Sequence, residues 1–297
     1  MLRPLLGWAA YLPLSWLHAI GGVIGRGVYL SSPRYARRLR ENLKASGVCP
    51  EPQAYRRLLR RTVAEAGKAV AELPKVWFGD PGRADALVRE CRGWEHVEAA
   101  LAAKRGLILL TPHLGCFEIA GLYLSRRLPM TILYRPPRVR WLEPLMIAGR
   151  ARGRAKLATT DLRGVRQLLK ALKRGEAIGV LPDQAPGRGD GVWARFFGRP
   201  AYTMTLVGRL AESTGAPVLM VFARRLPRGA GYRLSLTPLP PLPADPVQAA
   251  ERLNAAVEAL VRQCPEQYLW SYNRYKVPPG VAPPLAQGGR KKDPEGG

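Results

Sequence analysis

The sequence is poor in acidic residues, in histidine and in cysteine. Its 297 residues include 22 Asp and Glu against 47 Lys and Arg, which gives a net charge of +25 at pH 7. The four cysteines, Cys49, Cys91, Cys116 and Cys264, form no C-x-x-C pair, so they indicate neither a disulfide framework nor a zinc ribbon, and a reducing compartment fits best. With only three histidines, the chain has few ligands for a multi-histidine metal site, and we expect no metal and no cofactor.

The composition points to a folded protein with an anionic partner. Apolar residues make up 47% of the chain and charged residues 23%, which excludes a disordered chain of low hydrophobicity. The excess of cations fits nucleic acid, an anionic membrane surface, or an acidic protein or phosphorylated substrate. Zinc-finger spacing, a KH-type G-x-x-G loop and an RNP1-like strand are all missing from the sequence, so we do not expect nucleic acid.

The N-terminus combines an apolar segment with a basic one. No formally charged residue lies between Arg3 and Arg26, a run long enough to span a bilayer, although prolines and glycines interrupt it. We expect residues 1–30 to be a retained membrane anchor that either spans the bilayer or lies in its interface. Residues 26–61 are rich in Arg and Lys, which places this side in the cytoplasm by the positive-inside rule. The alternative is a buried core helix followed by a solvated basic helix.

Beyond residue 30, apolar runs suited to buried strands alternate with helical patterns. Such alternation predicts an α/β fold with a mostly parallel central sheet flanked by helices, here over residues 31–276. The Pro- and Gly-rich tail, residues 277–297, is expected to be disordered. The expected strands are 106–111, 130–134, 177–181, 217–223 and, as an edge strand, 232–239; the expected helices are 54–73, 115–127, 161–174 and 246–262.

Polar residues follow three of the expected strands. His113 comes after the first strand, Arg135 after the second, and Asp183 with Gln184 after the third. In an open parallel sheet the ligand lies at the carboxyl ends of the strands, so we expect these residues to share one rim.

The strongest chemical signal is an H-x-x-x-x-E arrangement, His113 to Glu118. The histidine ends a strand and the glutamate falls in the first turn of the next helix, so the carboxylate is expected to accept a hydrogen bond from Nδ1–H. That bond would leave Nε2 free to act as a general base. Cys116 is the one nucleophile in the turn, and we expect it to be a packing residue. The alternative is that His113 is simply a hydrogen-bonded histidine at a strand end.

The order and spacing of the motifs resemble one family. These motifs are His113–Glu118 (HLGCFE), Tyr134–Pro136 (YRP), Leu181–Gln184 (LPDQ), Phe196–Gly198 (FFG) and Pro265–Trp270 (PEQYLW). The chain resembles the lipid A biosynthesis late acyltransferases of the lysophospholipid acyltransferase superfamily across nearly its whole length. The resemblance implies a bacterial enzyme at the cytoplasmic face of the inner membrane that moves a fatty acyl chain from an acyl carrier protein thioester to a hydroxyl of a phosphorylated glucosamine lipid. His113 would deprotonate the hydroxyl, Glu118 would orient His113, and the hydroxyl would attack the thioester directly.

In that interpretation further residues bind the substrates. Arg135 is expected to stabilise the oxyanion or to bind a lipid phosphate, unless it pairs with a structural carboxylate. Asp183 is expected to hold Arg135 or to bind a sugar hydroxyl, with turn capping as the alternative, and Gln184 beside it is expected to bind substrate. Arg188 and Arg199, in the loop 185–203, are expected to contact lipid phosphates, although this loop is equally compatible with an ordinary surface loop.

Other functions remain open. Related enzymes act on lysophospholipids, ornithine lipids or glycosylated phosphoinositides, and some use coenzyme A thioesters. The charge favours the acyl carrier protein, which is acidic and would meet a basic docking face. A membrane scaffold that has lost activity is a non-enzymatic alternative, against which the intact His113 and Glu118 argue.

Overall fold

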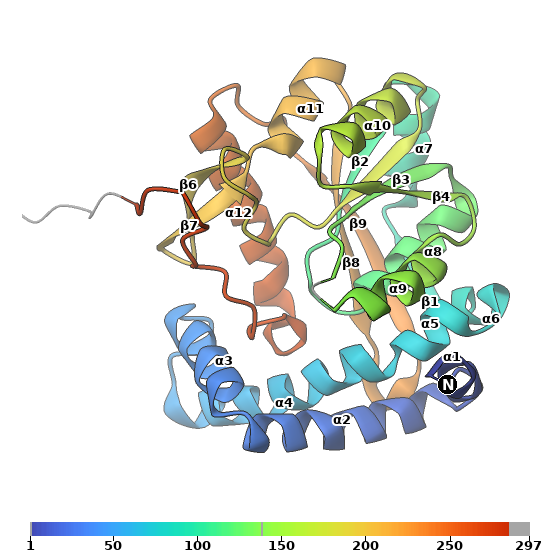
Figure 1. The fold of residues 1–297 in the computed structure, drawn as a ribbon, viewed down its shortest axis with the longest axis vertical. Helices are drawn as coiled ribbons and strands as arrows, with labels where there is room; N and C mark the ends of the chain where they lie inside the picture. The colour runs from blue at the N-terminus through green and yellow to red at the C-terminus, as the bar shows by residue number, and fades with distance from the viewer. Residues whose placement is uncertain (1, 138, 285–297) are drawn as a thin grey trace, which may run out of the picture.

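A seven-stranded sheet forms the centre of the computed structural model, and a layer of N-terminal helices covers one end of it (Figure 1). The structure describes residues 2–137 and 139–284, with only the backbone of residues 2–5. The sheet order is β1-β9-β8-β2-β5-β3-β4, and β6 and β7 form a separate hairpin. The strands are β1 (Val88–Arg92), β2 (Leu107–Leu110), β3 (Met130–Tyr134), β4 (Ala155–Thr159), β5 (Ala177–Val180), β6 (Gly191–Phe196), β7 (Arg199–Met204), β8 (Val218–Arg225) and β9 (Tyr232–Leu239).

Strands β8, β2, β5, β3 and β4 are parallel, whereas β9 runs antiparallel to β8. The expected α/β fold with a mostly parallel sheet is therefore confirmed. The expectation that 232–239 is an edge strand is wrong, because β9 lies between β8 and β1, with which it pairs in parallel. Strands β1 and β4 and the β6–β7 hairpin were not expected from the sequence. Strands β1 and β4 are the sheet edges, and their charged, partly exposed sequences lack the apolar runs by which buried strands were identified.

The helices cover both faces of the sheet and add the N-terminal layer. Their bounds are α1 (Leu2–Ala9), α2 (Leu14–Ser31), α3 (Pro33–Ala45), α4 (Pro52–Ala71), α5 (Leu73–Phe78), α6 (Pro81–Asp85), α7 (Trp94–Ala102), α8 (Phe117–Arg127), α9 (Glu143–Arg150), α10 (Leu162–Lys173), α11 (Leu206–Thr214) and α12 (Pro246–Gln263). Short 3-10 turns are η1 (Arg140–Leu142), η2 (Pro227–Gly229) and η3 (Pro265–Gln267).

The central strand β2 is apolar at every position because helices cover both of its faces. Ile108 and Leu110 pack in one buried cluster with residues of α10 and α12, and Leu107 and Leu109 pack in another with residues of α7 and α8. Packing on both faces holds β2 in place and thereby positions the turn that follows it.

The N-terminal layer depends on close contact between α2 and α4. Gly21 and Gly25 of α2 lie against Gly67 of α4, where a Cβ on Gly67 would stand 1.9 Å from the Gly21 carbonyl oxygen. In Figure 1, α2 runs along the bottom of the molecule beneath α4. Across the described residues, no helix is both long and apolar enough to cross a membrane. The spanning form of the expected N-terminal anchor is therefore not found there, and the interfacial form stays a prediction.

The C-terminal segment beyond α12 runs back over the β6–β7 hairpin. The indole N–H of Trp193 donates to the Ala282 carbonyl (2.9 Å), and Arg188 lies against Gly280. Residues 285–297, the greater part of the tail for which disorder is expected, lie outside the described residues. The division of the chain at residues 30 and 276 stays a prediction.

Candidate functional site

His113 lies in the turn between β2 and α8, and backbone hydrogen bonds fix this turn on two sides. The carbonyl of His113 accepts from the Leu269 N–H (3.0 Å), and the Gly115 N–H donates to the Gln267 carbonyl (3.1 Å). The Cys116 N–H donates to the Ala223 carbonyl at the end of β8 (2.9 Å). Gly115 has a φ of +62°, and a Cβ there would stand 2.1 Å from the Ala223 carbonyl oxygen, so a glycine is required.

Asp183 holds the imidazole of His113. Its Oδ1 lies 2.7 Å from Nδ1, and its Oδ2 accepts from the His113 backbone N–H at 2.9 Å. Burial alone would raise the pKa of Asp183, which is 3% exposed, but the charge and the hydrogen bonds of His113 outweigh burial and hold this pKa below its ordinary value. The carboxylate is therefore ionised at neutral pH and keeps the proton of a neutral imidazole on Nδ1, leaving Nε2 as an acceptor.

The expectation that Glu118 accepts from Nδ1 is wrong. Glu118 instead binds the guanidinium of Arg150, with both of its oxygens 3.1 Å from Nε, and accepts from the indole N–H of Trp77 at 3.0 Å. The first turn of α8 directs this carboxylate toward α5 and α9, and the buried Asp183 at the end of β5 occupies the place expected for it. The expectation that Asp183 holds Arg135 is likewise not met, because both of its oxygens contact His113.

His113 lines a cavity of about 610 Å³, and its Nδ1 is the ring nitrogen bound to Asp183. The amide nitrogen of Gln184 lies 3.1 Å from Nε2. Arg135 and Arg150 line the same cavity. Of the four residues expected to share one rim, His113, Arg135 and Gln184 line this cavity, whereas Asp183 lies behind His113 and does not line it. The apolar lining residues are Leu133, Met146, Leu162, Val165, Leu181, Ala185, Pro186, Met204 and Leu206.

Arg188 and Arg199 do not line this cavity. Arg188 is exposed and lies against Gly280, and Arg199 stacks on the ring of Tyr275 at 3.9 Å. Their binding of lipid phosphates stays a prediction.

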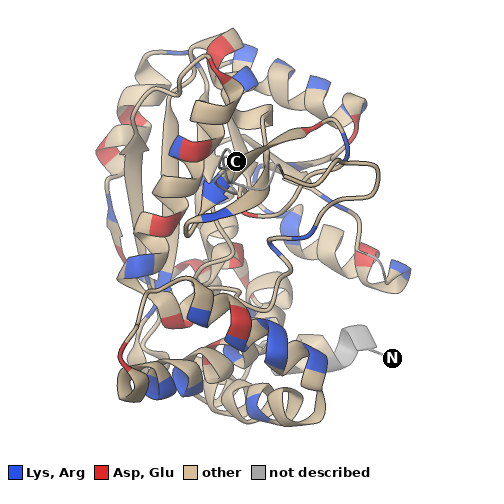
Figure 2. Cartoon of the chain, turned by 90° about the vertical axis from the view of Figure 1, so that its left-hand side faces the viewer, with Lys and Arg blue, Asp and Glu red and all other residues tan. Residues whose placement is uncertain are grey.

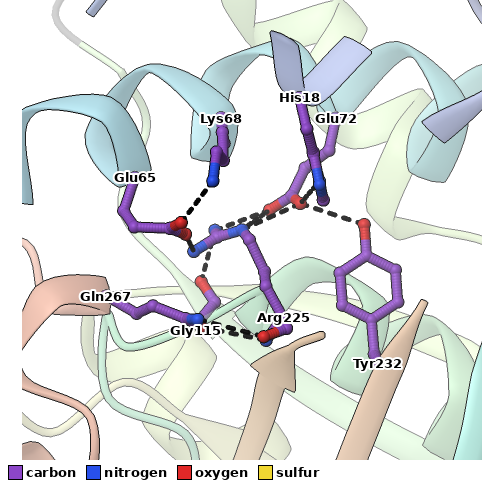
Figure 3. A network of polar contacts seen from close by, with 8 residues as sticks. All are labelled: His18, Glu65, Lys68, Glu72, Gly115, Arg225, Tyr232 and Gln267. Atoms are coloured by element: carbon purple, nitrogen blue, oxygen red, sulfur yellow. Dashed lines mark hydrogen bonds and ion pairs between the residues drawn. The ribbon is translucent and has the colours of Figure 1, made fainter. Parts of the chain in front are cut away.

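A buried ion pair, Glu72 with Arg225, contacts the turn that carries His113 (Figure 3). Arg225, at the end of β8, donates to Glu72 (2.6 Å) and to the Gly115 carbonyl (2.7 Å), and His18 of α2 and Tyr232 also contact Glu72 at 3.2 and 2.9 Å. Burial would raise the pKa of Glu72, but Arg225 and the hydrogen bonds lower it to about 2. The network joins the N-terminal layer to the turn that carries His113.

The site offers no activated nucleophile in this turn. Burial, and then the neighbouring charge of Glu72, raise the pKa of the Cys116 thiol well above its ordinary value, so this side chain stays protonated and packs. Within residues 2–137 and 139–284, no group of three or more His, Cys, Asp or Glu side chains is arranged to hold a metal ion. His113 and the groups that contact it are therefore the candidate residues of this site.

Two parts of the site were missed in the sequence analysis. His113 and Asp183 follow the adjacent strands β2 and β5, and their position at one edge of the sheet was expected. The spacing in the sequence did not show that the carboxylate of Asp183, and not that of Glu118, contacts the imidazole. Arg150 and Trp77 lie on helices, and no motif marks either of them.

Comparisons with known proteins agree with the resemblance. A model of the bacterial lipid A biosynthesis acyltransferase family matches residues 5–277. The chain is 30% identical over 281 residues to the lipid A biosynthesis lauroyltransferase of Escherichia coli (strain K12), a match that covers 92% of this chain and 89% of the relative. It is also 30% identical to the lipid A biosynthesis palmitoleoyltransferase of the same organism, over 81% and 78% of the two chains, and 27% identical to its lipid A biosynthesis myristoyltransferase, over 70% and 64%. The chain therefore belongs to the bacterial lipid A biosynthesis acyltransferase family and is an acyltransferase.

Proposed function

We propose that this enzyme transfers a fatty acyl chain from an acyl carrier protein thioester to a hydroxyl of a phosphorylated lipid A precursor at the cytoplasmic face of the bacterial inner membrane. The observation that carries the proposal is the imidazole of His113, held through Nδ1 by a buried carboxylate, in the lining of a large, mainly apolar cavity. Three arginines and two aspartates also line this cavity, namely Arg135, Arg150, Arg209, Asp161 and Asp190. A cavity of this size and lining suits an acyl chain with a polar reacting end.

The reaction runs through one tetrahedral intermediate. Nε2 of His113 takes the proton of the acceptor hydroxyl, and the oxygen forms a bond to the thioester carbonyl carbon. The carbon–sulfur bond then breaks, and the leaving thiolate takes the proton back from the imidazolium. Asp183 stabilises the imidazolium between these steps, and the acceptor hydroxyl displaces the Gln184 amide from Nε2. No acyl-enzyme forms.

Arg150 is the candidate for stabilising the oxyanion. Its side chain is 16% exposed, is fixed by Glu118, and lines the cavity together with His113. A guanidinium that is already held in place needs no reorganisation when negative charge develops, which is the condition for strong electrostatic catalysis. In this proposal Glu118 acts as a positioning residue for Arg150.

Arg135 is the candidate for binding a phosphate of the acceptor. It is exposed, lines the cavity at the end of β3, and makes no ion pair with a side chain described here. A guanidinium matches the oxygens of a phosphate in two-point contacts. This position at the rim suits a charged headgroup, whereas the reacting hydroxyl must reach the interior.

Membrane association is supported by the outer surface of α1 and α2. Between Trp8 and Leu30 a row of large apolar side chains is exposed, and the cations of α3 follow directly. Such a surface suits helices that lie in the membrane interface, where each cation near an anionic leaflet contributes about 1 kcal/mol. The exposed apolar residues are Trp8, Tyr11, Trp16, Ile20, Val23, Ile24, Val28 and Leu30.

The test is a matrix of donors and acceptors with the purified enzyme. Radiolabelled acyl groups are supplied as carrier protein or coenzyme A thioesters, against a lipid A precursor, a lysophospholipid and an ornithine lipid precursor in mixed micelles. The proposal predicts labelled product from the carrier thioester and the lipid A precursor. Transfer only to the other acceptors, or only from coenzyme A, would contradict the assigned acceptor or donor.

A further inference from the structure

Helix α10 carries a stripe of cations along its exposed face. One face of the helix is buried through Gly164, Leu168, Ala171 and Leu172. The opposite face bears Arg163, Arg166, Lys170 and Lys173, all of them exposed. The spacing of three, four and three residues places these cations within one narrow arc, over a length of about 15 Å at ~1.5 Å per residue. We call these four residues the α10 stripe.

The four cations of the α10 stripe form no ion pairs within the part of the chain that the structure describes, although Asp161, the N-cap of α10, lies close enough to Arg163 to interact with its charge. The next cation along the chain, Arg174, pairs with Glu176 at 2.7 Å. Each of the other helices that flank the sheet, α7, α8, α9, α11 and α12, contains at least one carboxylate, and α10 has none over its fully described length. The stripe therefore keeps a local positive potential that an anionic partner can use.

The stripe begins at the mouth of the His113 cavity. Asp161, Leu162 and Val165, from the first turn of α10, line that cavity, and two further exposed cations, Arg135 and Arg209, line it as well. Figure 1 shows α10 near the top of the molecule, whereas α2, with its exposed apolar residues, runs along the bottom. Figure 2 shows Lys and Arg on helices at both ends, so the basic character is not confined to the N-terminal layer.

We propose that the α10 stripe is the docking surface for the acyl carrier protein that delivers the thioester, an inference that rests on the proposed function. A carrier presents its acyl group on a flexible arm, so its body must dock beside the cavity opening. Carrier proteins are acidic, and a row of unpaired cations one helix long complements an acidic helix and speeds the encounter. A membrane surface fits this face less well, since the only exposed large apolar side chain on α10 is Leu162.

Two matched double variants test the inference. Arg166→Gln with Lys173→Gln removes two exposed cations seven residues apart on α10, and Arg37→Gln with Lys44→Gln removes an equivalent pair on α3. Both variants change the net charge equally and leave the cavity lining intact. Each is assayed with acyl carrier protein and with acyl pantetheine, a donor that has the thioester without the protein, at low and at high salt.

The α10 variant is expected to raise KM for the acyl carrier protein about tenfold at low salt, with kcat unchanged. The difference shrinks at high salt, and KM for acyl pantetheine does not move. The α3 variant keeps the native KM for the carrier and loses binding to vesicles of anionic phospholipid. The inference is overturned if the KM for the carrier is the same in the native enzyme and the α10 variant. It is also overturned if the α10 variant loses binding to vesicles and its KM for the carrier does not change. Both results leave the proposed reaction intact. A native enzyme that uses the carrier no better than acyl pantetheine overturns both the inference and the proposed donor.

Discussion

Replacing Asp183 with asparagine tests whether this carboxylate orients His113. In the native enzyme, its two oxygens meet two donors of the same residue, the ring Nδ1–H at 2.7 Å and the backbone N–H at 2.9 Å. Asparagine offers one acceptor oxygen and one N–H₂ group. If the amide oxygen continues to accept from the backbone N–H of His113, the amide N–H₂ group donates to Nδ1. The imidazole proton then lies on Nε2, which cannot act as the base.

The expected effect is a fall in kcat of about 10²- to 10⁴-fold, which corresponds to about 3–5 kcal/mol of transition-state stabilisation. The lower limit corresponds to the loss of a positioned base, and the upper limit adds the loss of the charge that stabilises the imidazolium. KM for both substrates is expected to stay near the native value because Asp183, 3% exposed and bound to His113, does not reach the acceptor.

The assay is acyl transfer at saturating donor and acceptor, with Asp190→Asn as the matched control. Asp190 is exposed and lines the same cavity, so this variant makes the same change in charge without touching the imidazole. The control is expected to retain kcat within about threefold, as is usual for an exposed polar substitution. The reasoning would be refuted if Asp183→Asn kept kcat within threefold of native, since that result would show that this carboxylate does not orient the base.

Three further predictions follow from the cavity and the N-terminal layer. Arg150→Lys keeps the charge but not the fixed guanidinium, so kcat should fall by about 10²-fold or more without a rise in KM for the donor, measured by steady-state kinetics. Glu72 has a folded pKa of about 2, depressed below its unfolded value near 4.5, so its stabilising effect is full above pH 4.5 and is lost as the pH falls toward 2. Glu72→Gln leaves Glu65, 3.5 Å away, as the remaining ion-pair partner of Arg225, and should lower the free energy of unfolding at pH 7. Denaturant titrations should show the difference in this free energy between the variant and the native enzyme shrinking between pH 4.5 and 2. Gly67→Ala, whose Cβ would clash with backbone, should destabilise the fold by at least about 1–3 kcal/mol, whereas Gly22→Ala, with no contact nearer than 3.8 Å, should be neutral or stabilising in thermal unfolding.

The central strands β2, β3, β5 and β8 could be predicted from the sequence because their burial leaves a largely apolar run. Residues 130–134 and 232–239 match β3 and β9 at both ends, and Asp161 caps α10 as expected, accepting from the Gly164 N–H at 2.8 Å. The edge strands β1 and β4 carry no such signal, since Ala158 is the only one of their residues that is buried. The order of strands in the sheet also follows from long-range pairing, which explains why β9 was taken for an edge.

The sequence predicted which residues lie together at the edge of the sheet, but not which hydrogen bonds they form. The rule that ligands bind at the carboxyl ends of parallel strands brought His113, Arg135 and Gln184 to one cavity. Which carboxylate reaches the imidazole depends on the direction in which the first turn of α8 points Glu118, and that direction is set by Arg150 and Trp77 on other helices. Sequence spacing contains no information on such contacts between distant elements.

The central claim is that His113 is the general base for transfer to a lipid hydroxyl, and the His113→Gln variant tests it most directly. Purified native enzyme and variant, matched for thermal unfolding temperature, receive labelled acyl carrier protein and lipid A precursor, and labelled lipid is followed by chromatography. The account predicts transfer by the native enzyme and a loss of at least about 10²-fold in the variant, because positioned proton transfer contributes that much. Transfer by the folded variant at the native rate would contradict it.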